Sequence, residues 1–254
     1  MARLVIFSDL HGNTPALEAF LAECEALQPD LVVNLGDIAS GAVDPRGTLE
    51  LLATRPDIVT VRGNHERQLT TRASHVEGGS DWLAARVLTD TDRAWLSSLP
   101  TRVQLAPGVL AFHGSPDDDL TYLLETVDSA APDGLREATD DEVRARLGPW
   151  IDTATVFVCG HTHLQRVRRL GPGLLVVNPG SLGWPAYEDD MPAAHRVEAG
   201  TPEARYLILD QDDGDPCGWR ATPRTIAYPY AVAAHLALAN GRPDVARALT
   251  TGRV

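Results

Sequence analysis

The sequence predicts an α/β protein with two packed sheets, on three observations. Short apolar runs rich in β-branched residues recur along the chain and each stops at a polar cluster. Segments with helical spacing separate the first three runs, and Pro-Gly or Asp-Gly turns join later ones. Continuous apolar runs of about four to eight residues are typical of strands covered on both faces. A chain of 254 residues is long enough for one elaborated domain with a sizeable core.

The opening unit is predicted as strand, helix, strand. The apolar run in RLVIFSDLHGN is followed by TPALEAFLAECEALQ, which has Pro15 near its start and apolar residues at helical spacing. The run in DLVVNLGD supplies the second strand. The segment DPRGTLELLATRP then predicts a second helix before the third strand, DIVTVRG.

After about residue 100 the pattern changes to paired strands. A Pro-Gly, Gly-Pro-Gly or Asp-Gly turn separates apolar runs in RVQLAPGVLAFHG, RVRRLGPGLLVVNPG and ARYLILDQDDGDPCGWRATPRTIAY. Such turns between apolar runs are typical of β-hairpins. These hairpins predict a second, more antiparallel sheet packed on the first.

Two stretches, 68–99 and 116–150, carry no strand signal and are predicted to be helical or irregular insertions. Both directly follow polar clusters, so we expect them to form walls over a site. Their tryptophans are assigned to the core rather than to a stacking platform: Trp82, Trp95 and Trp150.

The tail near 230–250 predicts two short helices interrupted at 240–243, and residues 1–254 are interpreted as a single domain. No apolar run reaches the length of about 18 residues needed to span a membrane, and the N-terminal stretch lacks a signal-peptide cleavage site, so we expect a cytoplasmic protein. The net charge of −13 disfavours an extended nucleic-acid surface. The three cysteines are too scattered for a disulfide framework or a thiolate zinc site.

Chemically active side chains collect where the apolar runs end. In an open α/β sheet, ligands bind beyond the carboxyl ends of the strands, and five of the eight histidines follow predicted strands. Each residue alone is weak evidence, because a single strand-end aspartate or histidine is more often a cap or a turn former. The combined set has two carboxylates, one carboxamide and four or more imidazoles: Asp9 and Asp37, Asn64, and imidazoles among His11, His65, His113, His161 and His163.

This donor set predicts a metal site. Oxygen and imidazole ligands without thiolate suit manganese, iron, nickel, cobalt or zinc better than magnesium or calcium alone. Seven candidates are too many for one catalytic zinc, which takes about three protein ligands. Two divalent ions bridged by one carboxylate would use the whole set, and we favour manganese. Such a pair can lower the pKa of a bridging water to make a nucleophile and can hold the oxygens of a phosphoryl group.

The ordered motifs DLH, GD, GNHE, HG and GHTH resemble those of the calcineurin-like metallophosphoesterases, from Asp9 to at least Ser181. The stretches SDLHGN and VNPGSLG are similar to the bacterial phosphodiesterase and predicted-phosphatase branch of that family. The resemblance implies a four-layer α/β/β/α sandwich of two mixed sheets flanked by helices. It also implies hydrolysis of phosphate esters, with phosphodiesters slightly ahead of monoesters, on a phosphorylated small-molecule or nucleotide substrate.

The resemblance further implies a role for each motif residue. His65 would protonate the leaving oxygen or stabilise charge on the phosphoryl group. Asp37 would bridge two metal ions. The first ion would be held by Asp9, His11 and His163, and the second by Asn64, His113 and His161.

Four neighbouring features each have two possible roles. Glu66 is expected either to orient a histidine or to cap the following helix. Asn13 either touches phosphate or is a turn residue before the Pro15 helix, and Arg67 either clamps a substrate oxygen or is solvated surface. The stretch 178–183 is expected to shape a loop near the site through its backbone rather than by direct contact.

Other activities are less well supported by the motifs. A protein phosphatase would carry an Asp-Arg-Gly arginine clamp after Asp37, whereas this chain has GDIASGAVDPRG, with Arg46 following a proline. A dinucleoside polyphosphate hydrolase remains an alternative. A non-catalytic interaction scaffold has no need of seven ligands, because unpaired polar groups cost stability.

Overall fold

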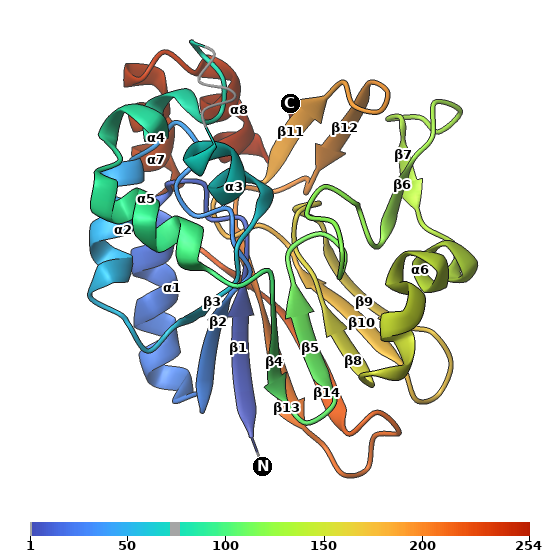
Figure 1. Cartoon of the computed structure of the whole chain (residues 1–254). Helices are drawn as coiled ribbons and strands as arrows, with labels where there is room; N and C mark the ends of the chain where they lie inside the picture. Colours follow the sequence, from blue (N-terminus) through green and yellow to red (C-terminus); the bar gives the residue numbers. More distant parts are fainter. Residues whose placement is uncertain (1, 72–76) are drawn as a thin grey trace.

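Two five-stranded mixed sheets form the centre of the computed structural model, which describes residues 2–71 and 77–254 (Figure 1). The first sheet has the order β14–β13–β1–β2–β3, in which β1, β2 and β3 are parallel and β13 is antiparallel to both of its neighbours. Its strands are β1 (Arg3–Phe7), β2 (Leu31–Asn34), β3 (Val59–Thr60), β13 (Ala204–Gln211) and β14 (Trp219–Ile226).

The second sheet has the order β4–β5–β8–β10–β9. Its three central strands are parallel, and an antiparallel strand pairs with each edge of that group. The strands are β4 (Arg102–Ala106), β5 (Val109–Phe112), β8 (Val156–Val158), β9 (Gln165–Arg169) and β10 (Leu175–Pro179).

The hairpin β13–β14 corrects one prediction, because it extends the first sheet and not the second. Strand β13 pairs with β1, with Val5 opposite Ile208. Its run alternates between two buried faces, so that Tyr206 and Ile208 pack with the first sheet's helices while Leu207 and Leu209 pack between the sheets. A hairpin turn fixes which two strands pair, but not which sheet they join.

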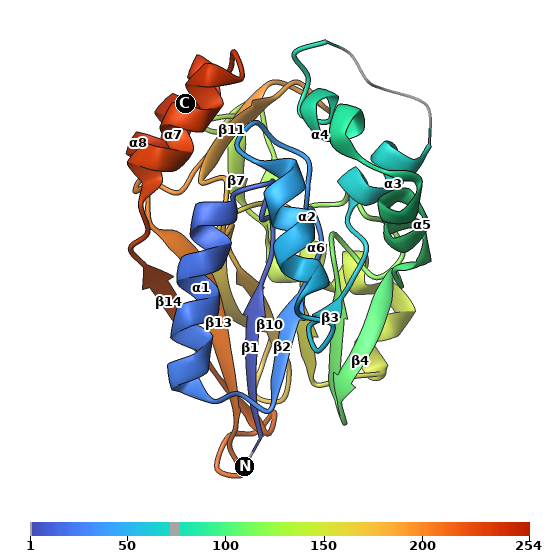
Figure 2. The same ribbon diagram turned by 90° about the vertical axis from the view of Figure 1, so that its left-hand side faces the viewer.

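Helices cover both outer faces and complete an α/β/β/α arrangement (Figures 1 and 2). Four helices lie on the side of the first sheet: α1 (Thr14–Leu27), α2 (Pro45–Ala53), α7 (Tyr230–Ala239) and α8 (Pro243–Thr251). Helix α6 (Asp140–Leu147) and the short 3-10 helix η1 (Gly148–Asp152) lie against the second sheet. The alternation of β1 shows the layering: Val5 and Phe7 pack toward the helices, whereas Leu4 and Ile6 pack between the sheets. The predicted fold class is therefore confirmed.

The two predicted insertions differ from each other. The stretch 68–99 is helical and irregular, with the end of α3 (Asn64–Thr70), turns over 77–81, then α4 (Trp82–Val87) and α5 (Asp90–Ser98). Residues 72–76 lie outside the described part. The stretch 116–150 contains a strand pair that we did not predict, β6 (Glu125–Val127) with β7 (Leu135–Glu137). A second unpredicted pair is β11 (Ala186–Asp189) with β12 (His195–Glu198). Such short strands are too brief to show an alternating pattern.

Two tryptophans of these insertions, Trp82 and Trp95, lie outside the core clusters, which corrects part of another prediction. Trp150 is partly buried and packs against the core on the outer face of the second sheet, as predicted. Trp95 is 36% exposed, and the other two are half-buried under arginine side chains. Arg86 lies over the ring of Trp82, and Arg102 lies over that of Trp150. Arginine stems and guanidinium groups cover aromatic rings at the surface, so a large apolar side chain there needs no place in the core.

In the tail, α7 and α8 are separated at residues 240–242, where the sequence predicts an interruption. Across the described residues, every helix is too short or too polar to cross a bilayer.

Candidate metal centre

The loops that follow the strands hold the candidate ligands in an unusual backbone conformation. Of the six non-glycine residues with left-handed φ in the described chain, five are candidate ligands. This region is unfavourable for residues with a Cβ atom and is populated mainly where the surrounding structure enforces it, often at functional sites. The angles are 55° at Asp9, 50° at His11, 55° at Asp37, 69° at His161 and 57° at His163.

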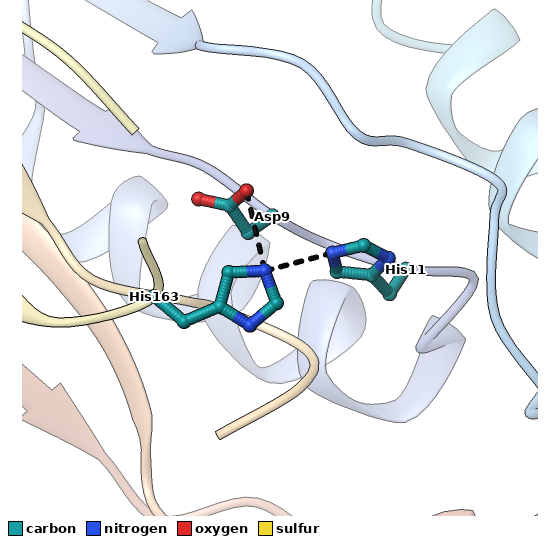
Figure 3. Close-up of side chains that lie close together, drawn as sticks. All are labelled: Asp9, His11 and His163. Carbon is teal, nitrogen blue, oxygen red and sulfur yellow. Dashed lines mark hydrogen bonds and ion pairs between the residues drawn. The ribbon is translucent and has the colours of Figure 1, made fainter. Parts of the chain in front are cut away.

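A first cluster joins Asp9, His11 and His163, whose ligand atoms all lie within 4.8 Å of one another (Figure 3). His163 Nε2 lies 3.0 Å from His11 Nε2 and 3.4 Å from Asp9 Oδ1. These residues come from the loops after β1 and β8, so the two sheets contribute to one cluster.

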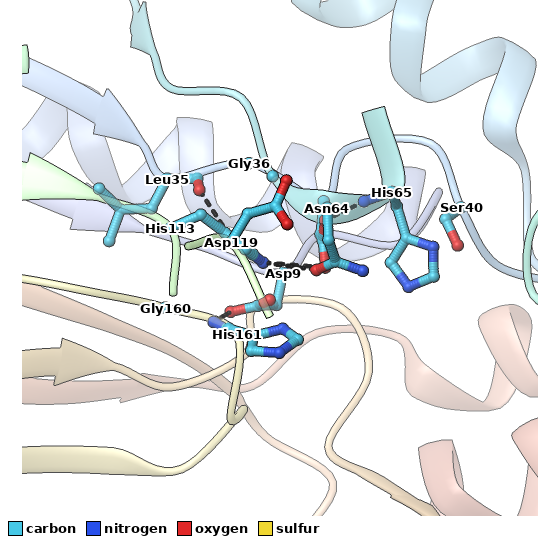
Figure 4. A network of polar contacts seen from close by, with 12 residues as sticks. Asp9, Leu35, Gly36, Ser40, Asn64, His65, His113, Asp119, Gly160 and His161 are labelled. Carbon is cyan, nitrogen blue, oxygen red and sulfur yellow. Dashed lines mark hydrogen bonds and ion pairs between the residues drawn. The ribbon is translucent and has the colours of Figure 1, made fainter. Parts of the chain in front are cut away.

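A second cluster joins Asp37, His113 and His161, again with ligand atoms within 4.8 Å. Asn64 belongs beside it, because its Oδ1 lies 3.0 Å from His113 Nε2 (Figure 4). Asp37 Oδ2 lies 3.2 Å from His113 Nε2 and 3.9 Å from His11 Nε2. The carboxylate of Asp37 therefore reaches toward both clusters.

Each of the four histidines has one ring nitrogen against a backbone carbonyl. A carbonyl oxygen only accepts, so this nitrogen carries the hydrogen and the other nitrogen of a neutral ring is free to bind a metal ion. The contacts are His11 Nδ1 to Ser40 O (2.8 Å), His113 Nδ1 to Leu35 O (2.8 Å), His163 Nδ1 to Trp184 O (2.6 Å) and His161 Nε2 to Leu120 O (3.1 Å).

The charges of the centre fit divalent metal ions. Burial lowers the pKa of His11 to about 3 and that of His161 to about 4, which favours the neutral, ligating form of both rings. Burial also lowers the pKa of His113, but the carboxylates of Asp37 and Asp9 outweigh it and raise that pKa to about 10. These carboxylates thus favour positive charge between them. Asp9 Oδ1 is buried without a hydrogen-bond partner in the described chain, as a ligand atom would be.

Glu66 supports the loop that carries Asp37. Its carboxylate accepts hydrogen bonds from the backbone N–H groups of Asp37, Ile38 and Gly63, all at 2.8 Å. The bond from Gly63 caps α3, which is one of the two readings offered by the sequence. In the described chain the hydrogen-bond partners of this carboxylate are backbone N–H groups and not a histidine ring, so the structure favours the capping reading over the other. The bonds to Asp37 and Ile38 were not predicted.

The stretch 178–183 acts through its backbone and short side chains. Ser181 Oγ donates to the carbonyl oxygen of Asp9 at 2.8 Å, and the N–H of Gly183 donates to the same oxygen at 3.1 Å. A Cβ atom on Gly183 would overlap the carbonyl oxygen of Leu10. The glycine therefore permits a close approach that holds the first ligand loop, without itself reaching the centre.

His65 lies beside the centre, with its ring centroid 5.4 Å from that of His11. Its Nδ1 is 2.8 Å from Asp81 Oδ1, a buried carboxylate that the sequence analysis missed. Burial lowers the pKa of His65, but the charges of Asp37 and Asp81 outweigh it and raise the pKa to about 9. A protonated imidazole can donate a proton, which is the chemistry that the sequence resemblance implies for His65.

Asn13 agrees with its reading as a local structural residue at the start of α1, whereas Arg67 forms an ion pair that neither of its readings predicted. Asn13 is fully buried, caps α1 through the N–H of Ala16, and donates to the Gly183 carbonyl (2.8 Å) and the Tyr228 hydroxyl (3.2 Å). Arg67 donates two hydrogen bonds of 2.7 Å to Asp119. Neither residue is among those that line the cavity described next, and contact of either with substrate stays a prediction.

A cavity of about 1110 Å³ opens at the centre. Beyond the candidate ligands and His65, its walls come from the loop before β6, from β11 and from α8. Three aromatic residues of the wall were missed by the sequence analysis, because none of them belongs to a recognised motif, although Trp184 directly follows VNPGSLG: Tyr122, Trp184 and Tyr187.

The fold and the paired clusters of carboxylate and imidazole define a metallophosphoesterase. A sequence model of the calcineurin-like phosphoesterase superfamily domain matches residues 2–199. The chain belongs to this superfamily and is a phosphoric ester hydrolase.

Solved structures show the same fold. A metallophosphoesterase from Sphaerobacter thermophilus has 24% sequence identity and a TM-score of 0.71, and the match covers 99% of each chain. A hypothetical protein from Pyrococcus horikoshii has 16% identity and a TM-score of 0.70, again over 99% of each chain. No curated protein matches this chain.

Proposed function

We propose that this phosphoesterase hydrolyses phosphate esters at a centre of two divalent metal ions, with phosphodiesters ahead of monoesters. The observation that carries the proposal is the position of Asp37, whose Oδ2 faces His113 at 3.2 Å and His11 at 3.9 Å. A carboxylate between two ligand clusters suits a metal bridge. We further propose that manganese is the preferred ion and that the substrate is a phosphorylated small molecule or nucleotide. We also propose a cytoplasmic location.

In this proposal the ligands divide between the clusters. Bound divalent ions would supply positive charge for the phosphoryl oxygens and would lower the pKa of a water molecule. His65 donates a proton to the leaving oxygen, and Asp81 holds its Nδ1. One ion would be held by Asp9, His11 and His163, the other by Asn64, His113 and His161, and both by Asp37.

Two features support a small diester as substrate over a phosphoprotein. The cavity extends from the centre to β11 and α8, which leaves room for an organic group on each side of the phosphorus. Arg46, the arginine that follows Asp37 in sequence, pairs with Glu50 and Asp92 and does not line the cavity. It is therefore not placed as an arginine clamp on substrate.

The test compares bis(4-nitrophenyl) phosphate with 4-nitrophenyl phosphate, using protein loaded with manganese. We expect turnover of both, with the diester ahead, and loss of turnover in EDTA. The proposal fails if neither ester is hydrolysed with manganese, nickel, iron or zinc.

Two variants separate metal binding from proton transfer. His65→Ala should retain two metal ions per chain and lose about 10²- to 10⁴-fold in kcat. Asp37→Ala should lose metal by elemental analysis. Exposed residues supply matched controls, His235→Ala and Asp213→Ala, which should keep both metal and turnover. Loss of metal from the His65 variant would show that its role is wrongly assigned.

A further inference from the structure

A chain of three side chains lies beside the candidate metal centre and has no part in the hydrolysis proposed above. Tyr122 Oη lies 2.7 Å from Tyr187 Oη and 3.0 Å from His195 Nε2. Both tyrosines are half-buried and line the cavity, whereas His195 is buried behind them.

The hydrogen bonds of this chain have a definite direction. His195 Nδ1 lies 2.8 Å from the carbonyl oxygen of Ala193, so Nδ1 carries a hydrogen. In the neutral ring Nε2 is then an acceptor, and Tyr122 donates its hydroxyl hydrogen to it. In its 2.7 Å contact with Tyr187, Tyr122 must therefore accept, which uses the single hydrogen of Tyr187. Tyr187 Oη is left as a hydrogen-bond acceptor on the cavity wall.

This acceptor lies close to both ligand clusters. The ring of Tyr187 packs edge-on against His163, with centroids 4.7 Å apart, and the ring of Tyr122 packs against His161, with centroids 5.0 Å apart. The Tyr187 hydroxyl is also 3.4 Å from the carbonyl oxygen of His161, a longer contact that competes for the same hydrogen. A group bound to Tyr187 Oη would thus belong to the organic part of an ester seated at the centre.

The charge of the cavity disfavours a second phosphate in this place. Arg242 is bonded to Asp244, and the terminal nitrogens of Arg146 donate to the carbonyl oxygens of Leu123 and Glu125 and to the Thr126 hydroxyl. Beyond the centre, the described lining holds four carboxylates and three arginines: Glu125, Glu188, Asp189 and Asp244, with Arg146, Arg242 and Arg247. A neutral group with a hydrogen to donate fits this wall better than another anion.

We propose that Tyr187 Oη accepts a hydrogen bond from a hydroxyl on the organic group of the substrate, so that the enzyme selects phosphodiesters of polyols or sugars over plain alkyl esters. This inference rests on the proposed phosphodiesterase function and adds the class of alcohol.

The first test varies the substrate. The manganese-loaded protein is given three 4-nitrophenyl phosphate diesters, whose second group is propyl, 3-methoxypropyl or 3-hydroxypropyl. One neutral hydrogen bond corresponds to about 2- to 10-fold in kcat/KM. We expect that advantage for the hydroxypropyl ester over both others, because a methoxy group has no hydrogen to donate. Equal kcat/KM values for the three esters in the wild type would overturn the inference.

The second test varies the protein. Tyr187→Phe should reduce the ratio of kcat/KM, hydroxypropyl over methoxypropyl, to about 1. Tyr230→Phe, the same change at a partly exposed residue of α7 away from the cavity, should keep the wild-type ratio. A Tyr187→Phe protein that retains the preference contradicts the inference while leaving the proposed hydrolysis intact.

A binding measurement separates this inference from the proposed function. If the wild type hydrolyses none of the three esters, the proposed function fails. Dissociation constants measured by calorimetry then test whether Tyr187 accepts a hydrogen bond from a ligand hydroxyl. 3-Hydroxypropylphosphonate should bind about 2- to 10-fold more tightly than propylphosphonate. Equal dissociation constants would overturn the inference as well.

Discussion

Replacing Glu66 by alanine should destabilise the protein and loosen the loop that carries Asp37. The Glu66 side chain is fully buried, and it accepts three backbone N–H groups at 2.8 Å, from Asp37, Ile38 and Gly63. Alanine leaves all three N–H groups without this acceptor. The change therefore acts on the start of α3 and on the bridging ligand together.

The size of the effect follows from these three bonds. A hydrogen bond to a charged group contributes about 1.5 to 3 kcal/mol, so their sum sets a ceiling of about 4.5 to 9 kcal/mol. Burial and the charge of Asp37 raise the pKa of Glu66 to about 7, which means that the ionised carboxylate is itself unfavourable and reduces the net loss. We expect the free energy of unfolding to fall by about 3 to 5 kcal/mol. In a chain of this size that lowers Tm by about 6 to 20 °C.

Thermal unfolding of the metal-free protein and elemental analysis of the metal-loaded protein measure the two consequences. Glu50→Ala is the matched control, because the Glu50 side chain is 66% exposed and its ion pair within the described residues is a helical one with Arg46, which contributes about 0.3 to 0.5 kcal/mol. The reasoning is refuted if the Glu66 variant unfolds within a degree or two of the Glu50 variant. We also expect metal affinity to fall about 10- to 100-fold.

Two further predictions concern Asp81 and Asn13. Asp81→Asn removes the charge beside His65, so kcat should fall about 10- to 100-fold with metal content unchanged. Because Asp81 raises the pKa of His65, the alkaline limb of the kcat/KM profile should move to lower pH, and an unmoved profile would contradict a positioning role. Asn13→Ala removes the cap of α1 and two donated hydrogen bonds, so unfolding should become easier by about 2 to 4 kcal/mol, measured in urea. A raised KM at unchanged stability would instead show that Asn13 contacts substrate.

The candidate ligands could be predicted because their position depends on local pattern and one general rule. Each follows an apolar run that reads as a strand, and the carboxyl ends of parallel strands meet at one edge. Asp81 and Tyr187 do not directly follow a recognisable apolar run, so the sequence did not indicate that they lie near the centre. Their partners lie 16 and 65 positions away in sequence, in stretches without periodicity, and only the three-dimensional path brings them together.

The same limit applies to the sheets. Turn residues predicted the hairpin β13–β14 correctly, but its sheet depends on which strand edge is open, and that edge belongs to β1 at the other end of the chain. Trp82 was misplaced for a related reason, because the arginine that covers its ring is visible only as a contact.

The left-handed backbone at five candidate ligands makes this centre vulnerable under selection for stability alone. Such a conformation disfavours a residue with a Cβ atom by about 1 kcal/mol or more, a penalty that glycine escapes. Glycine at Asp9 or His161 would remove a ligand and relax the backbone in one step. A laboratory lineage chosen only for heat resistance would be expected to discard the centre early, so thermostabilisation of this enzyme should be coupled to a screen for bound metal.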